Sequence, residues 1–187
     1  MGAIETFSER EVKEQFETNF FGLFKVTKSM LPYMRGQKPA SPAGRSGLII
    51  NVSSISGLFT TAYYGIYSAS KYAVEAITQA LRIEESLYGI KVVSVNPGSF
   101  ETKFWENEKF PKNTRSSLGK FNERIKAFIS RNKRRRGNSM VVAKKIREII
   151  ETKNPKKNYL IGWDVIALYL CLVYFLNQLL TGQSKRL

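Results

Sequence analysis

The sequence predicts an α/β fold built around a parallel β-sheet. Two short β-branched runs, at 47–54 and 88–98, are separated by a long helical pattern. A strand, a helix and a strand in this order form a βαβ unit, whose two strands run parallel because the helix returns the chain across the sheet. With 187 residues, of which 43% are hydrophobic, the chain is long enough for one domain with a sizeable core.

A long helix is expected to begin after Ser8. Ser8 and Glu11 have the spacing of a capping box, in which each side chain bonds the backbone N–H of the other residue. Apolar residues then recur every three or four positions as far as Met34, so one broad face of this helix is expected to be buried. Asn19 lies on that face among apolar neighbours, and the loop at 35–44 ends the pattern.

The later elements follow from the same periodicities. GLIINVSS at 47–54 fits a strand buried on both faces, and YGIKVVSVNPG at 88–98 fits a second buried strand. Between them, apolar residues from Tyr72 to Ile83 carry the period of a helix. A third helix and a last short strand are expected at 139–153 and 157–162.

Residue types that are absent limit the chemistry. The sequence contains no histidine, which excludes His-based triads, His-ligated metal sites and histidine general bases. We expect no metal site, and acid–base chemistry must use tyrosine, lysine or carboxylates. Cys171 is the single cysteine and cannot form an internal disulfide, and the first ten residues lack the basic start and apolar core of a secretory signal. We therefore expect a cytoplasmic protein.

Positive charge is concentrated in one part of the chain. The formal net charge is +15, and the segment 103–157 carries 18 Lys and Arg against 5 Glu. A solvated surface is the favoured interpretation, with an anionic membrane surface, an acidic substrate or nucleic acid as alternatives. Nucleic acid is not expected, because the segment has neither a zinc-finger spacing nor the aromatic and glycine pattern of an RNA-binding sheet.

The segment 165–180 is uncharged and almost entirely apolar. A membrane-spanning helix needs about 20 such residues, so this segment is short for a span. A buried or dimer-contact helix is the favoured interpretation. A helix lying in a membrane interface and a true span remain as alternatives, and the neighbouring basic segment favours the interfacial one, so peripheral membrane association is a second hypothesis.

Tyr67 and Lys71 stand four residues apart at the start of the second helical pattern. This spacing alone is a weak signal, but Ser54 precedes Tyr67 by thirteen residues at a strand end, and Pro97 and Gly98 end the next strand. Together with Asn19 in the preceding helix, these residues resemble the site of the short-chain dehydrogenase/reductase family. The resemblance extends over nearly the whole chain, and it implies a Rossmann-like, doubly wound parallel sheet.

The resemblance also implies a role for each catalytic residue. Tyr67 matches the general acid/base, and a positive charge on Lys71 beside its hydroxyl is expected to favour the ionised form. Ser54 matches the serine that hydrogen-bonds the substrate oxygen, with its neighbour Ser53 as the local competitor for that role. Asn19 matches the asparagine that helps to bind a water in the family's proton relay, and a buried core amide is the alternative.

The implied cofactor is NAD(P). In the family the lysine and tyrosine also contact the nicotinamide ribose, which assigns Tyr67 and Lys71 to cofactor binding. Pro97, Gly98 and Thr102 match the loop that contacts the nicotinamide carboxamide. The structural alternative is that Pro97 and Gly98 simply end a strand.

The family's dinucleotide site begins with a strand, a glycine-rich turn and a helix, and the sequence resembles only the part beyond them. We therefore expect a sheet that is incomplete at the N-terminus, with residues 1–162 as a partial catalytic domain and 163–187 as an apolar C-terminal helix and tail. By itself this chain is expected to be unstable or to associate, and to bind a nicotinamide cofactor weakly.

The sequence supports two hypotheses for the function. The first is an NAD(P)-dependent oxidoreductase that interconverts an alcohol and a carbonyl, with Tyr67 as general acid/base and a homo-oligomer as the expected assembly. The second is a truncated, non-catalytic paralogue that acts as a dimerisation or interaction module. An apolar substrate is favoured for the enzyme by a set of aromatic and aliphatic side chains, namely Leu58, Phe59, Tyr63, Phe104 and Trp105. The alternative is that these side chains cover the core.

Overall fold

The computed structural model describes residues 1–37, 46–107, 110–112, 118, 124, 126–127 and 136–165. It confirms the α/β class and the parallel sheet. The strands β1 (Gly47–Val52), β2 (Ile90–Pro97) and β5 (Asn158–Ile161) form one sheet in the order β1-β2-β5, and both pairings are parallel. A short parallel pair, β3 (Phe100–Glu101) and β4 (Gly137–Asn138), was not predicted.

The helices lie close to the predicted ranges, with two differences. The expected long helix is divided into α1 (Glu9–Phe16) and α2 (Gly22–Arg35) by a π-helical turn at Glu17–Phe21. The second helix, α3 (Gly65–Glu84), begins earlier than its apolar period and so contains Tyr67 and Lys71. The third, α5 (Met140–Glu151), agrees with the prediction. Short 3-10 turns are formed by Ile4–Thr6, Ile55–Gly57 and Glu85–Tyr88.

The capping box at the start of α1 is confirmed. The Ser8 hydroxyl accepts a hydrogen bond from the Glu11 N–H, and the Glu11 carboxylate accepts one from the Ser8 N–H at 2.8 Å. Both orphan donors at the helix start are therefore satisfied by this pair. The same carboxylate accepts from the Ser8 hydroxyl, and these bonds lower the pKa of Glu11.

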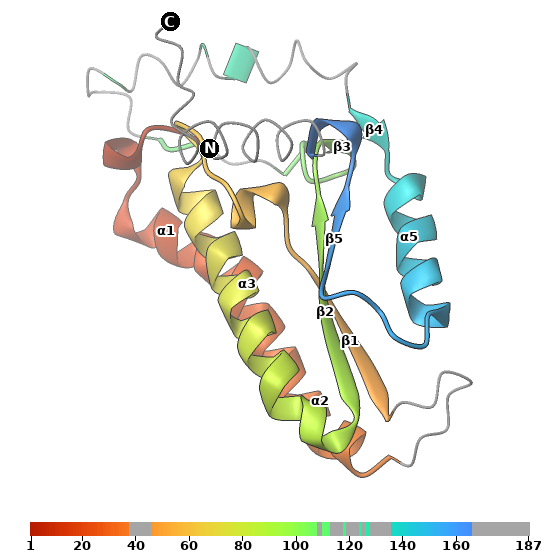
Figure 1. Cartoon of the computed structure of the whole chain (residues 1–187). Coiled ribbons are helices and arrows are strands. Elements are labelled where there is room, and N and C mark those ends of the chain that lie inside the picture. The colour runs from red at the N-terminus through yellow and green to blue at the C-terminus, as the bar shows by residue number, and fades with distance from the viewer. Residues whose placement is uncertain are drawn as a thin grey trace, which may run out of the picture.

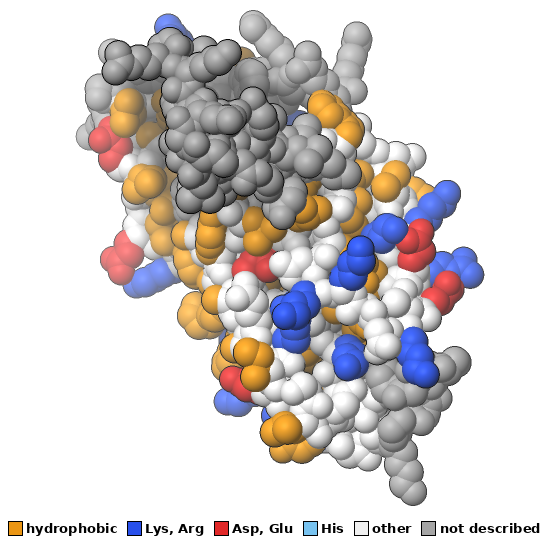
Figure 2. Space-filling view, in the orientation of Figure 1, with side chains coloured by type: hydrophobic (Ala, Val, Ile, Leu, Met, Phe, Trp, Pro, Cys, Tyr) orange, Lys and Arg blue, Asp and Glu red, His pale blue; other side chains and the backbone are white. Residues whose placement is uncertain are grey.

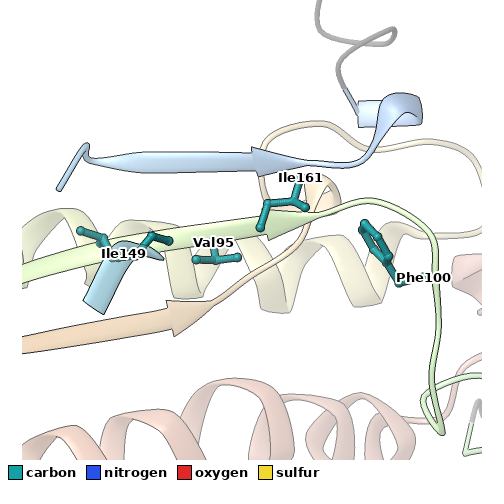
Figure 3. Close-up of a cluster of buried hydrophobic side chains, with 5 residues drawn as sticks. Val95, Phe100, Ile149 and Ile161 are labelled. Carbon is teal, nitrogen blue, oxygen red and sulfur yellow. The ribbon is translucent and has the colours of Figure 1, made fainter. Parts of the chain in front are cut away.

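Helices cover both faces of the sheet (Figure 1), with α2 and α3 on one face and α5 on the other. Alternate residues of β2 point to opposite faces, so Val93 and Val95 pack with Ile149 of α5 while Ile90 and Val92 pack towards α3. Figure 3 shows the first cluster, in which Val95, Phe100, Ile149 and Ile161 converge. Helices on both faces of a parallel sheet are the doubly wound arrangement.

Burial corrects one strand prediction. β2 is buried along most of its length, as predicted, but β1 is only half-buried at most positions and Val52 is 48% exposed. The reason is its place in the sheet, because β1 pairs with β2 on one side and forms the edge of the described sheet on the other. Between this edge and α2 lies a groove of about 450 Å³.

Several predictions fall wholly or partly outside the described residues. They concern the densest basic run, at 131–137, most of the loosely patterned region 103–136, and the apolar segment 165–180 with Cys171. In the part of the chain that the structure describes, no helix has the length and apolarity needed to cross a membrane. Figure 2 shows Lys and Arg side chains, with acidic ones among them, on the side of the molecule that carries α5.

Candidate active site

The start of α3 positions Tyr67 and Lys71. Gly65 opens the helix without a side-chain cap, and the Ser68 N–H bonds the Tyr64 carbonyl at 2.7 Å. Tyr67 therefore lies in the first turn, and Lys71 follows one turn later on the same face. The Lys71 ammonium donates a hydrogen bond to the Val52 carbonyl at 3.1 Å and lies 5.9 Å from the centre of the Tyr67 ring.

Ser54 follows β1 directly and faces Tyr67. It is the N-cap of the Ile55–Gly57 turn, where its hydroxyl oxygen accepts a bond from the Ser56 N–H at 3.1 Å, and it is 8% exposed. Its side chain also forms a hydrogen bond with Tyr67. The hydroxyl of Ser53 is buried, and within the described residues it has no hydrogen-bond partner. The geometry therefore favours Ser54 over Ser53 as the partner of the tyrosine.

These side chains line one cavity of about 640 Å³. Its walls come from the end of β1, the start of α3, the loop after β2 and the first turns of α5. The cavity brings together six of the seven site residues predicted from the sequence, namely Ser54, Tyr67, Lys71, Pro97, Gly98 and Thr102. The seventh, Asn19, is not part of the cavity wall.

The Asn19 side chain lies in the π-helical turn and reaches α3 from outside the cavity. Its amide donates a hydrogen bond to the Ser70 hydroxyl at 3.0 Å, and that hydroxyl donates to the Tyr67 carbonyl at 2.7 Å. π-Turns inside α-helices occur frequently at functional sites. Here the turn places Asn19 so that it holds the first turn of α3, on which Tyr67 lies.

Burial controls the ionisation of the central pair. It raises the pKa of the Tyr67 phenol, and the hydrogen bond with Ser54 acts in the opposite direction. It lowers the pKa of the Lys71 ammonium, and the Glu75 carboxylate opposes this shift. Burial therefore disfavours the charged form of both side chains, and the expectation that Lys71 favours the ionised tyrosine stays a prediction.

The loop after β2 is held by the segment that follows β5. The Gly98 N–H donates to the Ile161 carbonyl at 2.9 Å, and the Ser99 N–H donates to the Asp164 carboxylate at 2.8 Å. A β-carbon on Gly98 would overlap the Asp164 carboxylate and approach a methyl group of Val165 to 2.5 Å. Glycine is therefore required here for close approach of the two segments.

Aromatic side chains close one side of the cavity. The Phe104 ring lies 5.6 Å from the Tyr67 ring and 5.2 Å from the Trp105 ring. The Trp105 N–H donates to the Phe100 carbonyl at 2.6 Å, and the Arg136 guanidinium stacks 3.7 Å from its ring centre. This packing fixes an apolar wall directly against the tyrosine.

The predicted apolar lining is correct in part. Phe59, Phe104 and Trp105 line the cavity, whereas Leu58 and Tyr63 do not. Tyr63 instead adopts a left-handed backbone conformation, with φ of 69°, and its carbonyl accepts a bond from the Gly2 N–H at 2.8 Å. For a bulky residue this conformation costs about 1–3 kcal/mol, and such residues cluster near functional sites.

Two buried polar residues of the site were not predicted. The Asn96 amide donates to the Glu75 carboxylate at 2.6 Å and to the Ser54 carbonyl at 3.2 Å. Asn96 immediately precedes Pro97, and Glu75 lies one turn after Lys71. The available sequence signal was an acidic residue within the apolar stripe of a helix, four residues after a lysine.

Comparison with known protein families identifies the family of this chain. Residues 1–112 match the family model described as short chain dehydrogenase. The chain belongs to the short-chain dehydrogenase family. This assignment agrees with the parallel sheet and with the spacing of Ser54, Tyr67 and Lys71 in one cavity.

Two curated reductases are similar to more than half of the chain. A 3-ketodihydrosphingosine reductase of Bacteroides thetaiotaomicron is 47% identical over 106 residues, which are 57% of this chain and 37% of that protein. An NADPH-dependent 3-dehydrocapnine reductase of Ornithobacterium rhinotracheale is 37% identical over 108 residues, 58% of this chain and 37% of that protein.

The fold is similar over a longer stretch. The crystal structure of a short-chain dehydrogenase from Streptomyces avermitilis matches with a TM-score of 0.70 and 27% identity, covering 97% of this chain and 64% of that one. The chain spans about half the length of the curated relatives it matches, from 37% to 57% for the first of them.

Proposed function

We propose that this chain carries the catalytic site of an NAD(P)-dependent oxidoreductase that interconverts an alcohol and a carbonyl. One observation carries the proposal: the hydroxyls of Ser54 and Tyr67 and the ammonium of Lys71 line a single cavity together with the Pro97–Gly98 loop. The two hydroxyls can contact the same substrate oxygen, because they already bond each other.

Tyr67 acts as the general acid in the direction of carbonyl reduction. Its raised pKa keeps the phenol protonated at neutral pH, so a proton is available for the substrate oxygen. The Ser54 hydroxyl donates a hydrogen bond to the same oxygen and stabilises the charge that develops there. Giving up this proton leaves a phenolate, which the Lys71 ammonium stabilises, and in alcohol oxidation the phenolate takes the proton back from the substrate hydroxyl.

The residues of the cavity fit the nicotinamide end of NAD(P). Lys71 and Tyr67 offer donors for ribose hydroxyls, while Pro97, Gly98 and Thr102 form the adjoining wall. The Thr102 oxygen accepts a bond from the Phe104 N–H at 3.2 Å, which leaves its hydroxyl hydrogen free to donate to a carboxamide oxygen. When bound, the nicotinamide supplies or accepts the hydride. Asn19 holds α3 and, in our proposal, helps to bind a water of the proton relay.

The proposed substrate is an apolar carbonyl compound. The described wall includes Ile55, Phe59, Phe104 and Ile146, and Lys71 is its one charged residue among those described. Two relatives are named as a 3-ketodihydrosphingosine reductase and an NADPH-dependent 3-dehydrocapnine reductase. We therefore propose a ketone on a long alkyl chain as the first substrate class to test.

Steady-state reduction of such ketones with NADPH or NADH tests the proposal. We expect turnover that Tyr67→Phe lowers by roughly 10³-fold or more, because the proton donor is lost while the ring is retained. Tyr72→Phe is the matched control, since Tyr72 lies on α3 and is 44% exposed. Turnover that survives Tyr67→Phe would refute the role of the tyrosine.

A second candidate is favoured by a different surface. Apolar side chains of α2 are exposed beside the β1 edge, including Val26 at 66% and Met30 at 48%. Exposed apolar patches of this kind mark contact surfaces. A non-catalytic interaction module would use them to pair with a second copy, and we propose a homo-oligomer for either candidate.

A further inference from the structure

The α3 helix carries a third polar side chain on the face of Tyr67 and Lys71. Glu75 follows Lys71 by one turn, so the three side chains form one row along the helix. Glu75 is 3% exposed and Asn96, which it contacts, is fully buried. Groups this polar are rarely buried without a specific arrangement of partners.

The contacts of Asn96 connect three separate parts of the site. Its single amide group donates to the Glu75 carboxylate on α3 and to the carbonyl of Ser54 after β1. The amide oxygen accepts from the Ser94 hydroxyl at 3.3 Å, which fixes the orientation of the amide. Because Asn96 is followed by Pro97 and Gly98, the same residue also sets the start of the loop after β2.

The contact with Asn96 uses only one of the two carboxylate oxygens of Glu75. One carboxylate oxygen accepts from Asn96, while the other is buried and has no hydrogen-bond partner among the described residues. The carboxylate favours the charged form of Lys71 against the effect of burial. It acts in the same direction on Arg82, two turns further along α3.

The other charged groups on the elements packed against α3 are exposed or already paired. On the elements packed against α3, Glu17 and Lys91 are exposed, and Glu85 forms an ion pair with Arg35. The charges of α1 pair with each other or with Ser8. Tyr67 is the other titratable group beside Lys71.

We propose that Glu75 and Asn96 are positioning residues for the dehydrogenase reaction: Asn96 fixes the backbone of Ser54 against α3 through its two hydrogen bonds, and Glu75 acts on Lys71 through its charge, one turn away on the same face of α3. This inference rests on the proposed function. The two contributions are separable, because one acts through hydrogen bonds and the other through charge. Neither residue contacts the substrate.

Glu75→Gln tests the charge. Glutamine keeps the shape of the side chain and an oxygen that accepts from Asn96, but it removes the negative charge beside Lys71. The pKa of Lys71 should then fall, and the alkaline limb of the kcat profile should move to lower pH, with little change in kcat at the optimum. NMR titration of the Lys71 side chain in the full chain, assigned with Lys71→Met, measures the same shift without turnover.

Asn96→Ala tests the hydrogen bonds. It should lower kcat by on the order of tenfold to a hundredfold, the effect expected of a small displacement of a reacting group, with KM little changed. Thr78→Val is the matched control, because Thr78 is a fully buried residue of α3 whose hydroxyl bonds Asn51 at 2.8 Å. This variant should lose stability to a similar extent and keep kcat.

The outcomes distinguish this inference from the proposed function. If the wild-type chain turns over no carbonyl but Glu75→Gln still lowers the pKa of Lys71, the proposed reaction fails and the charge contribution of Glu75 stands. If turnover is present and Glu75→Gln moves neither the pH profile nor the NMR titration, the role of Glu75 is overturned. Equal kcat losses in Asn96→Ala and Thr78→Val would show that Asn96 is merely structural.

Discussion

Ser53 and Ser54 are identical side chains in adjacent positions with different surroundings. The Ser54 hydroxyl caps the Ile55–Gly57 turn and bonds Tyr67, whereas the Ser53 hydroxyl is buried with no partner among the described residues. The sequence left the choice between them to a spacing of thirteen residues. The structure shows in which direction each side chain points, and the spacing along the sequence cannot give this information.

Replacing each serine by alanine separates their roles. Ser54→Ala should lower kcat by roughly 10²-fold, because a donor to the developing oxyanion is lost, and should cost about 1 kcal/mol of stability through the lost cap. Ser53→Ala should be neutral or stabilising and keep kcat, since removing a buried unpaired hydroxyl relieves a desolvation cost. Kinetics and urea unfolding of both variants measure these effects. A larger kcat loss in Ser53→Ala would reverse the assignment.

Lys71 makes a pH-dependent contribution to stability. Because its folded pKa lies below the ordinary value of 10.5, the folded chain binds fewer protons than the unfolded chain between those two values. Stability from this group is therefore reduced at lower pH and recovered as pH rises through that window. The free energy of unfolding of the wild type should rise relative to Lys71→Met as the pH is raised towards 10.5. A constant difference in urea unfolding across the range would contradict this.

Among single residues, those with a local signature could be predicted and those defined by tertiary contacts could not. Tyr67, Lys71 and Ser54 stand at fixed spacings along the chain, and all three line the cavity. Asn96 and Glu75 meet only when β2 packs against α3, so no spacing marks the pair. The raised pKa of Tyr67 likewise depends on burial, which the sequence does not supply.

At the scale of elements, periodicity predicted the helices and strands but not their interruptions. The apolar pattern from Val12 to Met34 runs through the π-helical turn without a break. A single wider turn adds only one residue to the spacing, so the pattern does not reveal it. The half-buried state of β1 follows from its place at the edge of the described sheet. The β3–β4 pair joins residues more than thirty positions apart and has no short-range signal.

The junction between the β2 loop and the segment after β5 gives a prediction for one glycine. Gly98→Ala should cost about 1–3 kcal/mol, since the added methyl would overlap Asp164 and crowd Val165. Gly36→Ala is the matched control, because its nearest atoms lie 3.7 Å away at ordinary contact distance. Thermal unfolding of both variants provides the comparison. Equal stability of the two would mean that the close approach at Gly98 is absent.

At the scale of the whole molecule, the feature with the largest physical consequence is the edge that β1 forms in the described sheet. The groove between β1 and α2 is lined by apolar side chains, and Val26 and Met30 are exposed along it. An edge strand beside an exposed apolar surface favours association with another chain. Lys and Arg side chains, with acidic ones among them, lie on the side that carries α5, which covers the opposite face of the sheet from α2.

Association at this groove can be measured directly. Sedimentation velocity should show that the chain self-associates at micromolar concentration and that Val26→Lys weakens association by roughly tenfold, because a charge enters the apolar contact. Asn154→Lys adds the same charge at an exposed polar position away from α2 and should have little effect. A monomeric wild type, or equal weakening by both variants, would contradict the proposed contact.

We propose that the cavity of Ser54, Tyr67 and Lys71 supports hydride transfer to a carbonyl. The most direct test is to supply NADPH or NADH carrying deuterium at the transferred position, with a long-chain ketone, and to analyse the alcohol by mass spectrometry. We expect one deuterium on the carbinol carbon with the wild-type chain and almost no labelled alcohol with Tyr67→Phe. Unlabelled alcohol, or equal labelling by both proteins, would contradict it.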